Sequence, residues 1–376
     1  MIPEEYYIND NRTDKFFSTK TFSGFLKKDV VSTLNKCLTK GEIEESCYWS
    51  SEYLVSGMHN AIYDKLITFC CKNINILNPK LPTLIYLRYS HYIENLSKIM
   101  NKYGKDKLIE LRNIQTIRNH IAELCCIICQ SRKNKSIGLK KINQQYFSPE
   151  LFQQLLKSNK DYIGYLVRPG DPNELKIVLN EFYNNLINKN YNGCHFWFSW
   201  IIEWEKMIIK KNKEYKCGYR EIKGVDKKFY CDCIWFVWEI LLKESIKKED
   251  EVTKQIQSLY KLFKFNYTNS KKNKRTMFIL YAIKYFTDNY IFSSLVPEQH
   301  LLIQSTGNIN TMYNSRKKHE INNKDYLEEK LNQYNIEQKK KKQATSKKKV
   351  NISDLSNKKI LTVDQIDAFI IKSKSF

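Results

Sequence analysis

Cysteine and histidine side chains are the residues of this chain best suited to hold a metal ion. Two groups have enough soft ligands for a tetrahedral zinc site: Cys217, Cys231 and Cys233 with His195, and Cys125, Cys126 and Cys129. Neither group has the paired CxxC…CxxC spacing that identifies zinc sites reliably. Cys125 and Cys129 would share one face of a helix, where thiols pack as small apolar groups. We therefore expect core packing and predict no metal ion and no cofactor, with zinc as the alternative.

Three glutamates lie beside tryptophans in the sequence: Glu52, Glu203 and Glu239. A carboxyl group in an aromatic environment has a raised pKa and can act as a general acid or base. The alternative is an ion pair with an arginine of a neighbouring helix, for which the chain offers Arg88, Arg112 and Arg118. No histidine stands near these acids in a catalytic arrangement, so we expect a non-enzymatic protein. An enzyme that uses Glu52 or Glu203 in an aromatic pocket is the third hypothesis.

Sequence motifs of several large enzyme classes do not occur in the chain. It has no GxxxxGK[ST] loop and no GxGxxG turn, which argues against a P-loop ATPase and a dinucleotide-dependent enzyme. It also has no GxSxG and no HExxH, the motifs of α/β-hydrolases and of zinc peptidases. These absences favour a binding function over catalysis.

Basic side chains are the most abundant candidates for binding. The formal net charge is +23, from 63 Lys and Arg against 40 Asp and Glu, and such a charge attracts polyanions. Because Lys outnumbers Arg, we expect contacts with phosphates rather than recognition of bases. A composition rich in Lys, Asn and Ile also follows from an AT-rich genome. A solvated basic surface without a binding role is therefore the alternative.

The candidate nucleic-acid-binding residues fall in three stretches. The first two flank tryptophan-rich segments, and the third lies near the C-terminus. Two tyrosines interleave with the first stretch and could stack on bases. The full set is Lys210, Lys211, Lys213, Tyr215, Lys216, Tyr219 and Arg220, then Lys271, Lys272, Lys274 and Arg275, and finally Lys339, Lys340, Lys341, Lys342, Lys347, Lys348 and Lys349.

Hydrophobic residues recur with helical spacing over most of the first 300 residues, and only 11 Gly and 7 Pro interrupt the chain. The most aromatic stretch, residues 194–209, has Trp197, Trp200 and Trp204 at helical spacing and is predicted to be a buried central helix. Residues 231–242 are predicted to form a second tryptophan-rich helix. We predict an all-α fold, a multi-helical bundle or an irregular α-solenoid, with a disordered basic C-terminal tail.

Changes in composition divide the chain into four parts. An N-terminal arm (1–25) precedes a helical subdomain (26–132). A Lys- and Asn-rich linker then leads to a second helical subdomain that contains the tryptophan-rich core (147–300). Lys, Asn, Gln and Glu dominate residues 301–376, which we predict to be a flexible tail that ends in a short amphipathic helix. Residues 271–275 are expected to form an exposed basic connection.

The compartment follows from the termini and the cysteines. The N-terminal residues include early acids and no apolar h-region, so no signal peptide is expected. No uncharged stretch reaches the length of about 20 apolar residues that a transmembrane helix needs. The odd cysteine count of 11, with adjacent pairs, indicates reduced thiols in a cytosol-like compartment. We expect a soluble intracellular protein.

Two blocks of the sequence resemble a group of helical proteins from nucleocytoplasmic large DNA viruses, the giant viruses. The first block is Tyr48–Gly57 with Asn78–Pro82 and Tyr86–Tyr89, and the second is Phe198–Glu205. The resemblance covers about residues 40–290. The group has no established activity, so the resemblance implies no catalytic residue. It implies a setting, which is the viral factory in the host cytoplasm or the virion.

These observations predict a non-enzymatic nucleic-acid-associated protein of a large DNA virus. Its role would lie in replication, transcription or genome packaging, and its lysine clusters would bind phosphates without sequence preference. The second hypothesis is a helical scaffold or adaptor that binds other viral proteins. Whether the nucleic acid is DNA or RNA does not follow from the sequence.

Overall fold

The computed structural model describes residues 2–134, 137–158, 160–211, 217–288 and 298–323, together with 328–329, 332–333 and 335–336. Regular structure in these residues is helical, and their β-type pairing is limited to one bridge between Lys20 and Leu26. The prediction of an all-α fold is confirmed. The chain forms two compact units, one of residues 1–8 and 19–319 and a second of residues 9–18 and 320–376.

The first unit contains fourteen named α-helices among its described residues. They are α1 (Lys27–Lys40), α2 (Ile43–Val55), α3 (His59–Phe69), α4 (Leu81–Tyr103), α5 (Gln115–Gln130), α6 (Pro149–Leu155), α7 (Asn173–Ile187), α8 (Tyr191–Lys211), α9 (Ile234–Ser245), α10 (Asp250–Lys264), α11 (Asn269–Arg275), α12 (Met277–Thr287), α13 (Gln299–Gly307) and α14 (Ile309–Asn314). Short 3-10 or π segments lie between them: η1 (Glu4–Tyr6), η3 (Cys70–Ile74), η4 (Asn75–Leu77), η5 (Lys105–Asn113), η6 (Gln144–Phe147), η7 (Gly164–Leu166), η8 (Lys227–Phe229) and η9 (Lys317–His319). In the second unit, η2 spans Asp14–Phe17.

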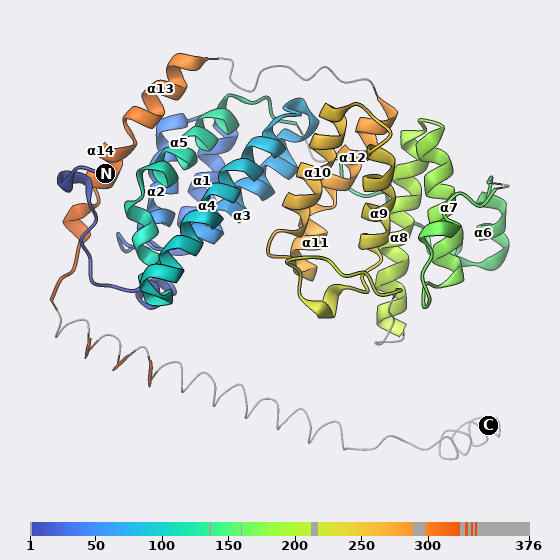
Figure 1. The fold of residues 1–376 in the computed structure, drawn as a ribbon, viewed down its shortest axis with the longest axis horizontal. Helices are drawn as coiled ribbons and strands as arrows, with labels where there is room; N and C mark the ends of the chain where they lie inside the picture. Colours follow the sequence, from blue (N-terminus) through green and yellow to red (C-terminus); the bar gives the residue numbers. More distant parts are fainter. Residues whose placement is uncertain are drawn as a thin grey trace, which may run out of the picture. The chain divides into compact units, whose positions relative to one another are not determined.

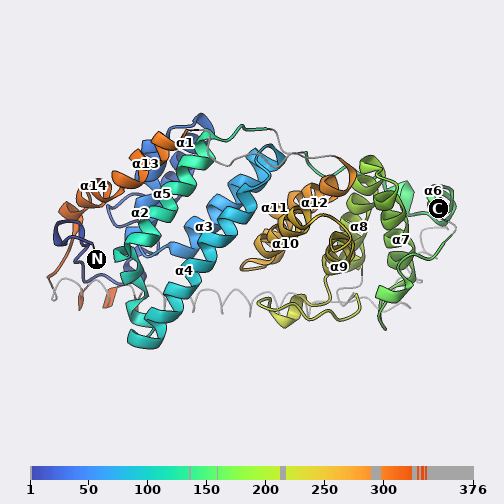
Figure 2. The ribbon, with the colours of Figure 1, turned by 45° about the horizontal axis from the view of Figure 1, so that its top comes forward.

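Helix α2 is the common packing partner of the N-terminal helices. It contacts α1, α3 and α5, and it also contacts α13 and α14 from the far end of the sequence (Figures 1 and 2). The turn from α1 into α2 depends on Gly41, which adopts a left-handed conformation at the end of α1 with φ of 84°. A Cβ at this position would lie 3.3 Å from the Cys129 carbonyl oxygen of α5, so a glycine also allows the close approach.

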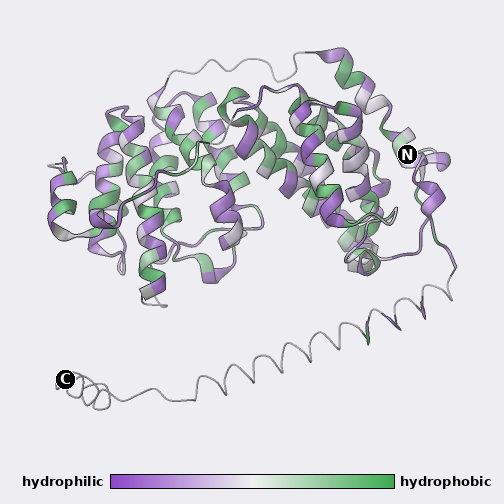
Figure 3. Ribbon diagram, turned by 180° about the vertical axis from the view of Figure 1, so that it is seen from behind, coloured by the Kyte–Doolittle hydropathy of each residue, from purple (hydrophilic) through white to green (hydrophobic). Residues whose placement is uncertain are grey.

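Helix α10 joins the other helices of the unit. It packs against α4, α9 and α12, while α8 packs against α7 and α12. Ile256, Leu259 and Phe263 repeat at helical spacing on its buried face. Figure 3 shows apolar and polar residues alternating along most helices, as expected when each helix buries one face.

The two predicted tryptophan-rich helices correspond to α8 and α9, and their tryptophans are buried as predicted. Trp197, Trp200 and Trp204 of α8 are at most 5% exposed, and Trp235 and Trp238 of α9 are each 1% exposed. The rings of Trp200 and Trp204 stack with centroids 5.8 Å apart. Large aromatic side chains dominate the energetics of burial. Helices α8 and α9 therefore form the aromatic core of this unit, and α12 packs against both while α10 packs against α9.

Buried arginines are the feature that the sequence did not predict. Five of the nine arginines are at most 2% exposed: Arg112, Arg118, Arg220, Arg275 and Arg316. Each donates hydrogen bonds to main-chain carbonyls. Except for the Tyr48 carbonyl that Arg316 contacts within α2, these carbonyls lie at the ends of helical segments, where they have no partner within the helix. Arg275 contacts the Leu262, Phe263 and Phe265 carbonyls at the end of α10. The planar guanidinium has five donors, which suits it to several such carbonyls at once.

Two predicted boundaries are wrong. Residues 271–275 are not an exposed connection, because they belong to α11 and two of their side chains are buried. The flexible tail does not begin at residue 301, because α13 and α14 pack against α5 and α2. Residues 337–376, where we predicted the rest of the tail and its short helix, lie outside the described residues.

The C-terminal helices are held by an ion pair with Glu52, the acid that the sequence placed beside Trp49. Glu52 is fully buried and pairs with Arg316, which follows α14. It also accepts hydrogen bonds from the main-chain N–H and the hydroxyl of Ser23. The prediction that Glu52 pairs with an arginine is confirmed, but the partner is Arg316 and none of the three arginines that we considered. Arg88 pairs with Glu123 instead.

Replacement of Arg316 by Met should destabilise the protein strongly. A buried carboxylate left without its cation lowers the free energy of unfolding by about 3–5 kcal/mol. Lys206→Met is the matched control, because Lys206 and Glu203 form an exposed pair with side chains 54% and 49% exposed. Such a pair contributes about 1 kcal/mol or less. Urea denaturation measures both. A loss below about 1 kcal/mol for Arg316→Met would contradict the anchoring role.

Candidate functional site

The first predicted stretch is only partly on the surface. Lys210 is exposed near the end of α8, and Tyr219 is 54% exposed. Arg220 is 2% exposed, so its prediction as a phosphate-binding residue is corrected: it belongs to an internal charge network. The side chain of Lys211 and three further predicted residues, Lys213, Tyr215 and Lys216, lie outside what the structure describes.

The second predicted stretch divides in the same way. Lys274 is exposed, and the half-buried Lys271 lies 3.5 Å from Asp64. Lys272 and Arg275 are buried, which corrects their prediction as surface residues. The third stretch lies outside the described residues: Lys339, Lys340, Lys341, Lys342, Lys347, Lys348 and Lys349.

The buried Lys272 joins α11 to the tryptophan-rich helix α8. Its Nζ atom donates to Glu205 Oε2 at 2.8 Å and to Asp232 Oδ2 at 3.3 Å. Glu205 also accepts the main-chain N–H of Cys233, and Tyr267 donates its hydroxyl to Asp232. Burial raises the pKa of Asp232. The lysine is therefore a structural cation that compensates two buried acids.

Three lysines gather beside α11, and we name them the α3–α11 lysine cluster: Lys65, Lys72 and Lys274. They come from α3, η3 and α11, so two of the three are far in sequence from the predicted stretch. Burial, followed by repulsion from Lys274 and Lys72, lowers the pKa of Lys65. An anion placed among them would relieve this repulsion.

A second group, the α10 lysine cluster, consists of Lys223, Lys261 and Lys264. Burial, then repulsion from Lys261 and Lys223, lowers the pKa of Lys264. The Lys264 ammonium donates to the Lys223 carbonyl at 3.0 Å and lies 5.1 Å from the centre of the Tyr260 ring. Lys261 lies 4.5 Å from the centre of the Tyr86 ring. Cations are thus interleaved with aromatic rings here, in the arrangement that the sequence predicted for the neighbouring Tyr219.

A cavity of about 200 Å³ lies next to the α10 lysine cluster. Trp235, Trp238 and Tyr260 contribute its aromatic side, and Glu239 with Arg168 contributes its charged side. Glu239 Oε1 accepts from Arg168 at 2.6 Å, and its Oε2 accepts from Arg220 at 2.8 Å. Because both carboxylate oxygens are paired with guanidinium groups, Glu239 is a poor general base.

The charge network behind the cavity centres on Asp171. Arg220 donates to its Oδ1 at 2.9 Å and to its Oδ2 at 3.0 Å, and the Cys217 thiol donates to Oδ1 at 2.8 Å. Burial acts to raise the pKa of Asp171, but the hydrogen bonds from Arg220 and Cys217 outweigh it and lower the pKa to about 2.

The other candidate acids do not border this cavity. Glu52 is fully buried in its ion pair, and Glu203 is exposed beside Lys206. Glu239, which the sequence placed beside Trp238, is the one of the three that borders it. The adjacent tryptophan was therefore a usable signal, but it did not separate Glu239 from the other two.

The cysteine groups have ordinary packing partners. Cys125 contacts the Ser50 hydroxyl at 3.1 Å, and Cys129 contacts the Ser46 hydroxyl at 3.3 Å. His195 contacts the Gly138 carbonyl oxygen at 3.0 Å. In the part of the chain that the structure describes, no three His, Cys, Asp or Glu side chains are placed to share a metal ion.

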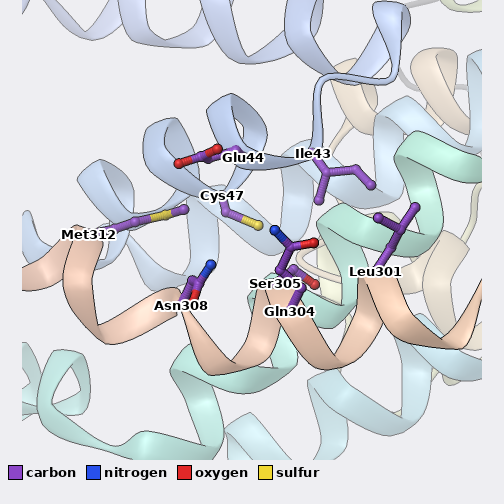
Figure 4. Close-up of a pocket in the computed structure, with 8 residues that line it drawn as sticks. All are labelled: Ile43, Glu44, Cys47, Leu301, Gln304, Ser305, Asn308 and Met312. Carbon is purple, nitrogen blue, oxygen red and sulfur yellow. The ribbon is translucent and has the colours of Figure 1, made fainter.

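A second cavity, of about 180 Å³, lies between α2 and the C-terminal helices (Figure 4). Ile43, Glu44 and Cys47 of α2 line one side, and Leu301 of α13 with Met312 of α14 lines the other. A hydrogen bond with Cys125, together with burial, raises the pKa of Cys47 well above the usual range. This thiol therefore stays protonated, which makes it a weak nucleophile.

Comparison with known proteins does not add a functional assignment. No protein family, curated protein or solved structure matches the chain. None of the helices among the described residues is both long enough and apolar enough to cross a membrane. The functional argument therefore depends on the site itself.

Replacement of Asp171 by Asn should lower stability in a pH-dependent way. The folded pKa is about 2 against about 3.9 in an unfolded chain, so the ionised group stabilises the fold above pH 4 and this contribution is lost between about pH 4 and pH 2. We expect a loss of about 1.5–3 kcal/mol at pH 7 that shrinks as the pH falls through this window. Asp226→Asn, in an exposed pair with Lys228, is the control. Denaturation at several pH values measures the difference, and a difference independent of pH down to 2 would contradict the network.

Proposed function

We propose that this chain binds nucleic acid without sequence preference, through lysines on its folded part. Residues 337–376 contain 11 lysines and four acids, which leaves a formal net charge of +16 on residues 1–336. The Lys-rich segment near the C-terminus therefore adds to the charge but does not account for most of it. A basic folded part is the electrostatic signature expected of a protein that contacts phosphates.

The distribution of Arg and Lys supports contacts with phosphates rather than with bases. Five of the nine arginines are buried in internal contacts, so most of the accessible positive charge belongs to lysines. Lysine carries a compact charge without the fork that reads guanine edges. Contacts of this kind displace counterions, which makes affinity depend on salt and only weakly on sequence.

The observation that carries the proposal is the lack of ion pairs in the two lysine clusters. Among the described residues, none of Lys65, Lys72, Lys274, Lys223, Lys261 and Lys264 forms an ion pair with a carboxylate. The neighbouring Lys271 and Lys272, in contrast, are paired with Asp64 and Glu205. In the described part of the chain, these six clustered ammonium groups therefore have no paired carboxylate and are available to phosphates.

The setting of this function rests on the resemblance alone. It suggests a non-enzymatic protein of a large DNA virus that acts in replication, transcription or genome packaging. The viral factory in the host cytoplasm, or the virion, is the proposed location. Nucleic acid is abundant in the viral factory and in the virion, and it is the partner that the lysine clusters favour.

A second candidate function is that of an adaptor for other viral proteins. Ile303 of α13 is 65% exposed, and the apolar cavity of Figure 4 lies beside the same helix. Ile303 does not line this cavity, but an exposed isoleucine and a cavity lined in part by Leu301 and Met312 each suit an apolar side chain of a partner protein. Ile303→Asp should therefore weaken the binding of such a partner and leave nucleic-acid binding unchanged.

Replacement of Lys65, Lys72 and Lys274 by Gln in the full chain should weaken binding to DNA and RNA alike. With three phosphate contacts removed, the slope of log Kd against log salt should fall by about 2. The same change is expected for Lys223, Lys261 and Lys264. Fluorescence anisotropy with a labelled oligonucleotide at 50–300 mM salt (about the range where counterion release is measurable) gives both slopes.

The control is a triple variant at exposed lysines outside the clusters: Lys28→Gln, Lys36→Gln and Lys189→Gln. It removes the same formal charge, so it isolates the effect of position from that of net charge. Equal losses for the cluster variants and the control would reduce the proposal to general attraction by a basic protein. Binding that does not change with salt would contradict it altogether.

A further inference from the structure

The cavity beside the α10 lysine cluster has an aromatic lining of defined geometry. Tyr260 meets Trp238 at a centroid distance of 5.5 Å and Trp235 at 6.5 Å, both edge to face. Tyr260 is half-buried, whereas the two indoles are 1% exposed and close the inner side of the cavity. A flat ring that enters beside Tyr260 would meet the aromatic surface of that side chain.

The cavity is continuous with the α10 lysine cluster. Tyr260 lines the cavity and also lies under the Lys264 ammonium. Ile222 lines the cavity as well, next to Lys223 in the chain. On the other side, Lys243 borders the cavity and is exposed. A base in the cavity would therefore have its own phosphate and those of its neighbours close to ammonium groups.

The charged side of the cavity does not oppose such a ligand. Glu239 is neutralised by Arg168 and Arg220, and Arg168 keeps 39% of its side chain exposed. Glu221 also lines the cavity and is exposed, and Lys243 offsets its charge. The arrangement suits an uncharged aromatic ring that is covalently linked to a phosphate.

We propose that this cavity binds one unpaired base of a single-stranded nucleic acid, with the flanking phosphates on the α10 lysine cluster. The base stacks on the half-buried Tyr260. A base inside a duplex is stacked and paired, so duplexes make only the phosphate contacts. This inference rests on the proposed function and adds to it a preference for single strands.

The test uses the full chain and three 12-nucleotide probes (about the length that one such site contacts). They are a single strand, a blunt duplex and an abasic strand with the same number of phosphates. We expect the wild-type protein to bind the single strand about tenfold more tightly than the abasic strand, which reflects one stacked base. Equal affinities for these two probes would overturn the cavity proposal, and this comparison needs no variant.

One variant assigns the effect to the cavity. Tyr260→Leu removes the stacking surface, so affinity for the single strand should fall about tenfold while duplex affinity stays unchanged. Tyr162→Leu is the matched control, because Tyr162 is also half-buried but does not line the cavity, and it should not change the ratio of single-strand to duplex affinity.

The outcomes separate the two proposals. If none of the probes binds, the proposed function itself fails. If all three bind equally and the lysine variants weaken them equally, the function stands and the base-binding cavity is wrong. A loss at Tyr260 that is equal for single strand and duplex would also reject the cavity, because it would show a general effect on folding.

Discussion

A guanidinium group buried against main-chain carbonyls recurs at the points where helices of this protein end. Arg275 at the end of α10, Arg112 at the end of α2 and Arg220 at the end of η7 all contact such carbonyls. A helix end that is buried needs partners for these acceptors, and water cannot reach them. Arginine supplies several donors at once and keeps its charge, so it also requires a carboxylate nearby. Asp64 meets that requirement for Arg275 and Asp171 for Arg220, and Glu110 lies 3.6 Å from Arg112.

This use of arginine decides what remains on the surface. The charge available to a partner is carried mainly by lysine, which is solvated, mobile and without directional preference. Two places differ from a uniformly basic surface. The folding of α3 with α11, and of α10 with the 217–225 segment, brings together lysines that form no ion pair with a carboxylate among the described residues. The fold thus converts a composition that an AT-rich genome could explain into a specific arrangement. The cavity lined by Trp238 and Tyr260 adds an aromatic element to one of the two clusters.

The helices and the tryptophan-rich core followed from the sequence because periodicity is a local property. Trp197, Trp200 and Trp204 are close in sequence, and their spacing alone places them on a buried helix. The pairing of Arg316 with the Glu52 region did not follow, since Arg316 and its partner Ser51 are 265 positions apart. The run of basic residues led to the wrong prediction of an exposed connection at residues 271–275. In the structure, Lys272 donates to Glu205 and Arg275 donates to carbonyls at the end of α10. The cavity could not be predicted, because Arg168, Glu239 and Tyr260 meet only when α9 packs against α10 and against the η7 region.

The central claim is that the buried arginines stabilise the interior, whereas the clustered lysines bind the nucleic-acid partner. Chemical footprinting of the native full chain, with a lysine-specific acylating reagent and an arginine-specific dicarbonyl read out by mass spectrometry, tests it most directly. The account predicts that Arg112, Arg118, Arg220, Arg275 and Arg316 stay unmodified, and that an oligonucleotide protects Lys65, Lys72, Lys274, Lys223, Lys261 and Lys264 more than Lys28 or Lys36. Reactive arginines at those five positions, or uniform protection of all exposed lysines, would contradict it.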